Sequence, residues 1–185
     1  MKAEVLYRKL LSELQARLAG KSLISSATQG NMIYLAGLAV GGAWLAERLA
    51  KDLALPQFGV INVAFHRDDY AEKGLSAMRS ASSMPTHLPF EVNGAHIILI
   101  DDVLSTGRTV RAALNELFDF GRPAQVELMV LADRGKRELP IAADFAAEFI
   151  DLPEQQILAL EKDAAGHFHF HIEERSAVVS TGTKS

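Results

Sequence analysis

No cysteine occurs anywhere in the sequence, which excludes disulfide bonds and thiolate chemistry and fits a reducing compartment. Long hydrophobic runs are also missing, because none approaches the roughly 20 residues that cross a bilayer. The N-terminal stretch carries Glu4 and Glu13 within a helical pattern, which argues against a signal peptide. We therefore expect a cytoplasmic protein that has no membrane partner.

An excess of basic residues is absent too. The chain has 19 Lys and Arg against 23 Asp and Glu, a formal net charge of −4. Strong nonspecific nucleic-acid binding depends on neutralising phosphates, so this balance argues against it, although it does not exclude a local basic face. The sequence has neither a Walker lysine motif nor a G-x-G-x-x-G fingerprint, so ATPase and dinucleotide-binding functions lose their main support.

The residues that are present indicate one α/β domain. The 185 residues suffice for a single core, and 49% hydrophobic with 23% charged residues is ordinary for a globular protein. Apolar runs typical of strands alternate with segments of helical period, which favours a parallel sheet flanked by helices. We expect this domain to cover residues 1–175, and the small, polar residues 176–185 to form a disordered tail.

The expected helices and strands follow from hydrophobic spacing and from glycine and proline positions. An N-terminal helix is indicated by apolar residues at three- and four-residue spacing: Val5, Leu6, Leu10, Leu14 and Leu18. Further helices are expected over 43–53 and 109–120, and the latter ends at Gly121. Strands are expected over residues 32–38, 59–65, 97–100, 126–131 and 145–150, and a C-terminal strand over 167–171 adds to the domain.

The most informative stretch is His96–Thr109, which reads HIILIDDVLSTGRT. Its apolar run ends in two carboxylates, Asp101 and Asp102, and a loop of small and hydroxyl residues then leads into a helix. This layout is typical of a site at the carboxyl end of a parallel strand, where the N–H groups that open the helix can bind a phosphate. The carboxylates can accept hydrogen bonds from ribose hydroxyls and hold Mg²⁺ through its waters. The alternative is a solvated strand end.

These residues resemble the phosphoribosyl-pyrophosphate (PRPP) signature of the type I phosphoribosyltransferases. Three longer stretches resemble the PyrR family, pyrimidine operon regulators that are also uracil phosphoribosyltransferases: residues 101–123, HRDD at His66–Asp69 and DRGKRELP at Asp133–Pro140. The similarity covers most of the chain. It implies the type I phosphoribosyltransferase fold, a parallel central sheet flanked by helices, with a flexible hood loop at about residues 68–92.

The resemblance also implies a set of site residues. Asp101 and Asp102 would hold the ribose hydroxyls and, through water, Mg²⁺, while Arg67 would neutralise the leaving pyrophosphate. The 5′-phosphate would lie in the loop made of Val103, Leu104, Ser105, Thr106, Gly107, Arg108 and Thr109. The pyrophosphate loop would be Val40, Gly41 and Gly42, and the residues that hold the base would be Asp133, Arg134 and Arg137.

The pyrophosphate loop departs from the best-known family pattern. That pattern has Lys-Thr-Arg-Gly where this chain has Ala39-Val40-Gly41-Gly42, so the cationic and hydroxyl side chains are missing. Pyrophosphate contacts would then come from backbone amides, from metal or from other residues. Plainer alternatives remain for three of the assignments: a tight turn at Gly41 and Gly42, a surface arginine at Arg67 and a charged surface turn at residues 133–140.

Three histidines, His167, His169 and His171, alternate with Phe168 and Phe170, which places the histidines on one face of a strand. Three stacked histidines suggest a metal site. However, residues two apart on a strand are separated by about 6.6 Å and converge poorly on one ion. We therefore expect a terminal strand that buries its phenylalanines.

The main functional hypothesis is a glycosyltransferase that converts uracil and PRPP to UMP and diphosphate with Mg²⁺. A second hypothesis, which the resemblance brings with it, is a regulator that binds pyrimidine-operon mRNA when UMP is bound and has weak or no catalysis. An exposed cluster of basic residues in the N-terminal region would support it: Arg8, Lys9, Arg17 and Lys21. A third is a transferase for a purine or orotate, which DRGKRELP disfavours. The resemblance also implies a homodimer or homotetramer.

Overall fold

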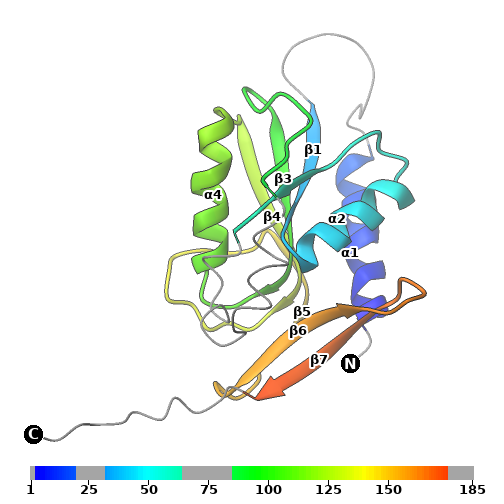
Figure 1. Ribbon diagram of the computed structural model, residues 1–185, viewed down its shortest axis with the longest axis vertical. Helices are drawn as coiled ribbons and strands as arrows, with labels where there is room; N and C mark the ends of the chain where they lie inside the picture. The colour runs from blue at the N-terminus through cyan, green and yellow to red at the C-terminus, as the bar shows by residue number, and fades with distance from the viewer. Residues whose placement is uncertain (1–2, 20–31, 64–84, 175–185) are drawn as a thin grey trace, which may run out of the picture.

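Five parallel strands form the central sheet of the computed structural model, which describes residues 3–19, 32–63 and 85–174 (Figure 1). Their spatial order is β2-β1-β3-β4-β5. The strands are β1 (Ile33–Leu38), β2 (Gly59–Ile61), β3 (His96–Leu104), β4 (Gln125–Asp133) and β5 (Phe145–Phe149). Because all of them run in the same direction, their carboxyl ends share one edge of the sheet, which confirms the predicted α/β architecture.

Helices cover both faces of this sheet. α1 (Ala3–Leu18) and α2 (Gly41–Asp52) lie on one face, and α4 (Arg108–Phe120) lies on the other (Figure 1). Successive strand residues point to opposite faces, so each strand contributes to two apolar clusters. Leu35 packs with α1 and α2, whereas its neighbour Ala36 packs with α4. Because both faces of β1 and β3 are buried, these strands need continuous apolar runs, and the sequence has them.

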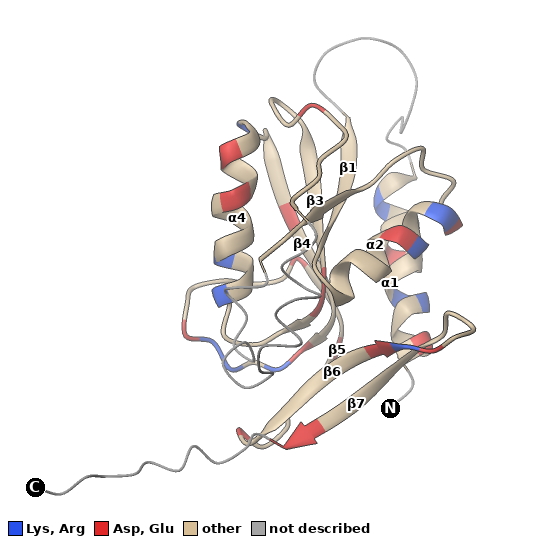
Figure 2. Ribbon diagram, in the orientation of Figure 1, with Lys and Arg blue, Asp and Glu red and all other residues tan. Residues whose placement is uncertain are grey.

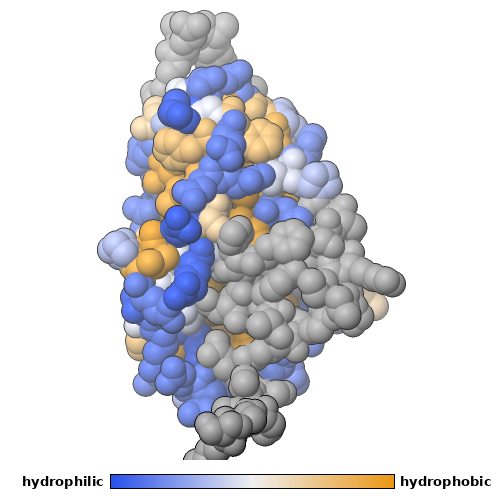
Figure 3. All heavy atoms as spheres, turned by 60° about the vertical axis from the view of Figure 1, so that its left-hand side comes forward, coloured by the Kyte–Doolittle hydropathy of each residue, from blue (hydrophilic) through white to orange (hydrophobic). Residues whose placement is uncertain are grey.

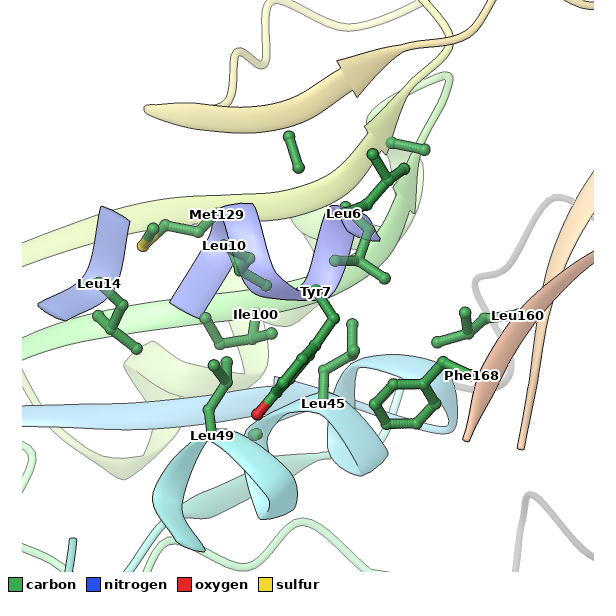
Figure 4. Close-up of a cluster of buried hydrophobic side chains, with 14 of the residues drawn as sticks. Leu6, Tyr7, Leu10, Leu14, Leu45, Leu49, Ile100, Met129, Leu160 and Phe168 are labelled. Carbon is green, nitrogen blue, oxygen red and sulfur yellow. The ribbon is translucent and has the colours of Figure 1, made fainter. Parts of the chain in front are cut away.

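The N-terminal helix is the amphipathic helix predicted from its spacing. Its buried residues include Leu6, Leu10, Leu14 and Leu18, and Tyr7 is buried with them. Figure 4 shows this helix above the sheet, with Leu45 and Leu49 of α2 in the same cluster. Val5 was expected in the stripe but is exposed, because it lies on the outer side of the helix.

The C-terminal strand does not join the parallel sheet. β6 (Gln156–Lys162), a strand that the apolar spacing does not predict, pairs antiparallel with β7 (Phe168–Glu174) to make a separate two-stranded sheet. Phe168 and Phe170 are buried and His169 and His171 are exposed, as the alternation predicts. Among the described residues, no group of three or more His, Asp or Glu side chains is placed to hold a metal ion.

Several element boundaries differ from the prediction. α2 begins at Gly41 rather than at residue 43, and α4 begins one residue before the predicted start. β3 continues through both carboxylates to Leu104 because its pairing with β4 extends to Asp133, so ladder hydrogen bonds lengthen the strand beyond its apolar run. β2 ends at Ile61, short of the predicted end at residue 65.

Other predicted features lie outside the described residues. These are Arg67, the tail at 176–185 and most of the proposed hood loop at 68–92. The end of that loop is described and is anchored: His87 and Val60 exchange two backbone hydrogen bonds of 2.8 Å, and the rings of Phe90 and Tyr34 stack with centroids 4.2 Å apart.

Figure 3 shows hydrophilic residues interspersed with several hydrophobic patches on the described part of this side of the molecule. Two large apolar side chains near the end of α4, Phe118 and Phe120, are exposed. The Arg122 guanidinium lies over the Phe118 ring, 5.6 Å from its centroid, and so partly covers that ring. None of the helices in the described ranges is long and apolar enough to cross a membrane.

Candidate active site

The loops that follow β1, β3 and β4 meet at the carboxyl edge of the sheet. The register places Gly37 of β1 beside Ile100 of β3, and Leu104 of β3 beside Asp133 of β4. The glycine loop, the acidic pair and the proposed base loop are therefore neighbours, as predicted. Figure 2 shows basic residues at the start of α4 and in the loop after β4, both at this end of the sheet.

The acidic pair is buried. Asp101 and Asp102 are each 3% exposed, and the backbone N–H of Asp102 donates to Oδ1 of Asp101 at 2.9 Å. Oδ1 of Asp102 has no hydrogen-bond partner within the described ranges. Burying a carboxylate oxygen without a donor is costly. A solvated strand end would have exposed both groups, so the burial argues instead for a site that receives a donor from a ligand.

The glycines after β1 let α2 begin directly against the acidic pair. A Cβ on Gly41 would lie 2.6 Å from Cγ and Oδ2 of Asp102, and a Cβ on Gly42 would lie 2.2 Å from the Ile100 carbonyl oxygen. A Cβ on Gly37 would likewise lie 2.3 Å from the carbonyl oxygen of Gly42. The Ala39–Val40 peptide that leads into this turn is cis. The turn is therefore closely packed, and the first residue of α2 lies against the Asp102 carboxylate.

The proposed phosphate loop lies between β3 and α4. Gly107 has a φ of +93°, which glycine adopts easily and other residues rarely do. The backbone N–H of Arg108 donates to Oγ1 of Thr106 at 3.2 Å, and the Arg108 side chain donates to Glu138 at 2.8 Å. The Thr106 carbonyl accepts from the N–H groups of Glu138 and Leu139 at 3.0 and 3.2 Å. This loop is therefore held by the loop that follows β4.

The hydrogen bonds described for the three proposed base-binding residues are all made to other residues of the protein. Arg134 is only 5% exposed, and its guanidinium donates to the carbonyls of Leu152 and Pro153 at 3.3 and 3.1 Å. Arg137 donates to Asp133 Oδ2 at 2.5 Å. The structure therefore brings the three residues to the predicted edge. Their role toward a base stays a prediction.

A model of the phosphoribosyl transferase domain matches residues 6–155 of the chain. The chain belongs to the phosphoribosyltransferase family. Its relatives place it among the PyrR proteins: the Bifunctional protein PyrR of Ralstonia nicotianae is 52% identical over 164 residues, which cover 89% of this chain and 88% of that protein. The corresponding protein of Nitrosococcus oceani is 44% identical over 158 residues, which cover 83% of each. The predicted family is confirmed.

Solved structures support the fold of this phosphoribosyltransferase. The hypoxanthine phosphoribosyltransferase of Trypanosoma cruzi, in complex with the product IMP, is similar with a TM-score of 0.53 and 18% identity. The similarity covers 82% of this chain and 74% of that one. At this level of identity the comparison concerns the fold alone, and it confirms the type I phosphoribosyltransferase fold that the sequence predicted.

Two contributors to the site were missed at the level of sequence. Gly37 lies inside an apolar strand and therefore looks like an ordinary strand residue, although the Gly37–Gly41–Gly42 spacing was a usable signal. Glu138 belongs to DRGKRELP but was not assigned a role, and it holds both the side chain of Arg108 and the backbone of Thr106. An acidic side chain does not bind phosphate, so the sequence suggests no role for Glu138. Only the contacts between the two loops show that it holds Arg108 and Thr106 in place.

Proposed function

We propose that this phosphoribosyltransferase transfers the phosphoribosyl group of PRPP to uracil, forming UMP and diphosphate. The observation that carries the proposal is the burial of Asp101 and Asp102. Oδ1 of Asp102 has no hydrogen-bond donor within the described residues. Asp102 of the pair lies against Gly41, and the pair immediately precedes the proposed phosphate loop in the chain, which supports the proposal. The choice of uracil rests on the resemblance of residues 133–140 to the PyrR family and on the names of the relatives.

Each part of PRPP would contact a different loop. Asp101 and Asp102 would accept hydrogen bonds from the ribose hydroxyls and stabilise the positive charge that develops at the anomeric carbon. The 5′-phosphate would bind in the loop from Val103 to Thr109, at the start of α4. Pyrophosphate would lie against Val40, Gly41 and Gly42, with Arg67 as its cationic partner. Positioning and electrostatics would then provide most of the rate enhancement, without a protein nucleophile.

Magnesium fits the same carboxylates. Two buried acidic side chains, one with an oxygen that lacks a described donor, suit a cation that keeps several of its waters. Asp101 and Asp102 would hold Mg²⁺ through those waters, and the ion would neutralise charge on the pyrophosphate group. The backbone of the loop 133–137 would hold the base beside this site, at the end of β4.

The test is UMP formation from uracil and PRPP with Mg²⁺, in the native chain and in Asp101→Asn and Asp102→Asn. We expect each substitution to lower kcat/KM by about 10²-fold or more, since charge stabilisation at a reacting centre is commonly of that size. The matched control is Asp163→Asn, because Asp163 lies in the exposed turn between β6 and β7. Turnover of hypoxanthine or orotate in place of uracil would show that the base is wrong.

A second role is suggested by the relatives, whose name describes a bifunctional protein. We propose that the chain also binds pyrimidine-operon RNA when UMP is bound. The basic cluster that would support this role is weakened, because Lys9 pairs with Glu148 at 2.9 Å and Arg17 with Glu13 at 2.8 Å, while Lys21 lies outside the described residues. A gel-shift titration of leader RNA with and without UMP tests it, and binding that ignores UMP would refute it.

The oligomeric state is proposed on the family resemblance alone. We propose a homodimer or a homotetramer. Light scattering coupled to size-exclusion chromatography measures the mass directly, and a mass near the 20.1 kDa of one chain would refute the proposal.

A further inference from the structure

Every nitrogen of the Arg137 guanidinium has an acceptor within the protein. Nε donates to the Ile141 carbonyl at 2.8 Å, Nη1 to the Ser105 carbonyl at 2.8 Å and Nη2 to Asp133 Oδ2 at 2.5 Å. The other oxygen of Asp133, Oδ1, accepts from the N–H of Gly135 at 2.8 Å. The Arg137 side chain is 24% exposed, so it is enclosed by these contacts. This arginine and its carboxylate connect the loop after β4 to the first residue after β3.

The contact between Arg137 and Ser105 fixes the orientation of the phosphate loop. In a trans peptide the C=O and the following N–H point in opposite directions. The Ser105 carbonyl points to Arg137, so the N–H of Thr106 points away from the 133–141 loop. The Thr106 carbonyl also faces that loop, where it accepts from two N–H groups, so the N–H of Gly107 points away as well. Successive N–H groups turned to one side form an anion-binding concavity.

We propose that Arg137, held by Asp133, is a positioning residue for the PRPP phosphate loop and not a group that reads the edge of the base. The inference rests on the proposed function, because it takes the 105–109 loop as the site of the 5′-phosphate. A lysine cannot replace this arginine: the planar guanidinium reaches three acceptors in three directions, whereas ammonium donates from a single atom. The three acceptors of Arg137 lie on two segments of the chain, Asp133 and Ile141 on the loop after β4 and Ser105 after β3.

The test compares Arg137→Gln and Arg137→Lys with the native chain. Steady-state rates give KM for PRPP and for uracil, and calorimetry gives Kd for ribose 5-phosphate, which carries the phosphate but no base. We expect both the KM for PRPP and the Kd for ribose 5-phosphate to rise about tenfold or more, as for loss of a charge-assisted hydrogen bond. The KM for uracil should stay within about threefold. Asp133→Asn should act in the same direction, and combining it with Arg137→Gln should add little, because the two side chains act as one unit.

The matched control is Arg17→Gln. Arg17 also bridges several segments, since it donates to Glu13, Glu127 and the Asp144 carbonyl, and its side chain is 27% exposed. Its partners lie toward the amino end of β4, away from the phosphate loop. Arg17→Gln should lower thermal stability to an extent similar to Arg137→Gln, yet it should leave the Kd for ribose 5-phosphate unchanged.

Two results would overturn the inference. One is a rise in KM for uracil in Arg137→Gln while ribose 5-phosphate binds as it does to the native chain. The other is an equal loss of ribose 5-phosphate binding in Arg17→Gln, which would make the effect global. If the native chain binds ribose 5-phosphate and Arg137→Gln weakens that binding, but no UMP forms from uracil, the positioning role stands and the proposed reaction fails.

Discussion

Gly41 and Asp102 are in direct contact where α2 begins. A Cβ on Gly41 would lie 2.6 Å from Cγ and from Oδ2 of Asp102, a separation that non-bonded carbon atoms do not reach. Asp102 is 3% exposed, so its carboxylate has little room to move aside. The absence of a side chain at residue 41 therefore determines where the Asp102 carboxylate of the proposed site can lie.

Gly41→Ala should impair catalysis more than stability. Gly41 is the first residue of α2, where the interior preference for alanine over glycine of about 1 kcal/mol applies only in part, so the helix itself should lose no stability from the change. The added methyl group displaces Asp102, and misplacement of a catalytic group by about 1 Å can cost roughly 10²-fold in rate. Initial rates of UMP formation and a urea unfolding curve on the same sample separate the two effects.

The control for this substitution is Gly94→Ala. Gly94 has a φ of +71° and no atom within 4 Å of the position that a Cβ would occupy. Alanine there should reduce stability by about 1 kcal/mol through backbone conformation alone and leave the rate of UMP formation unchanged. Full activity of Gly41→Ala would contradict the importance of the Gly41–Asp102 contact.

Gly107→Ala should affect both stability and the affinity for PRPP. Gly107 has a φ of +93°, and its Cβ would lie 3.1 Å from two side-chain atoms of Ile141. The left-handed conformation alone costs alanine about 1 kcal/mol. We expect a lower free energy of unfolding and a raised KM for PRPP, measured by urea denaturation and by steady-state kinetics. An unchanged KM would mean that the loop tolerates an altered backbone at residue 107.

The sequence was sufficient to predict the fold and the edge of the sheet that carries the site. Apolar runs such as Ile97–Ile100 are long and continuous because both faces of the sheet are covered, so they indicate a parallel α/β domain directly. The acidic pair after that run, followed by Gly107, marks the carboxyl end of one strand. The order of neighbouring residues along the chain was therefore enough to predict the fold and this edge of the sheet.

Contacts between distant segments were not predictable in this way. β6 (Gln156–Lys162) was missed because its apolar residues are consecutive and do not alternate with polar ones, a pattern that also fits a helix, and its pairing with β7 decides its conformation. The partners of Arg137 lie on loops that come together only through the β3–β4 register. Residue type suggested that this arginine would bind a ligand. The directions of its hydrogen bonds, which composition cannot supply, indicate otherwise.

Tyr7→Phe should weaken the packing of α1 on α2 by a modest amount. The Tyr7 hydroxyl donates to Asp52 Oδ2 at 2.7 Å, and the Arg48 guanidinium lies 4.2 Å from the centroid of the ring. Burial, together with the hydrogen bond to Asp52, raises the pKa of Tyr7 above its ordinary value, so the hydroxyl stays protonated. Removing the hydroxyl should cost about 1 kcal/mol in the free energy of unfolding, measured by urea denaturation. The rate of UMP formation should not change.

Stability below neutral pH should depend on the pair formed by Glu4 and Arg48. The two nitrogens Nη1 and Nη2 of Arg48 donate to Oε1 and Oε2 of Glu4 at 2.6 and 3.0 Å, and the N–H of Phe168 donates to Oε1 at 2.7 Å. Burial acts to raise the pKa of Glu4, but these hydrogen bonds and the Arg48 charge outweigh it, so the pKa lies below 4.5. The pair therefore links α1, α2 and β7 only while Glu4 is ionised.

The sign of the pH effect follows from this lowered pKa. A carboxyl with a lower pKa in the folded state contributes stability that is complete above its ordinary, unfolded pKa and is lost as the pH falls through the folded value. Urea unfolding between about pH 6 and pH 3 should show a shallower acid decline for Glu4→Gln and Arg48→Gln than for the native chain. The control is Lys9→Gln, whose ion pair with Glu148 is about half exposed and contributes little. Parallel declines in all four proteins would show that the pair does not determine acid stability.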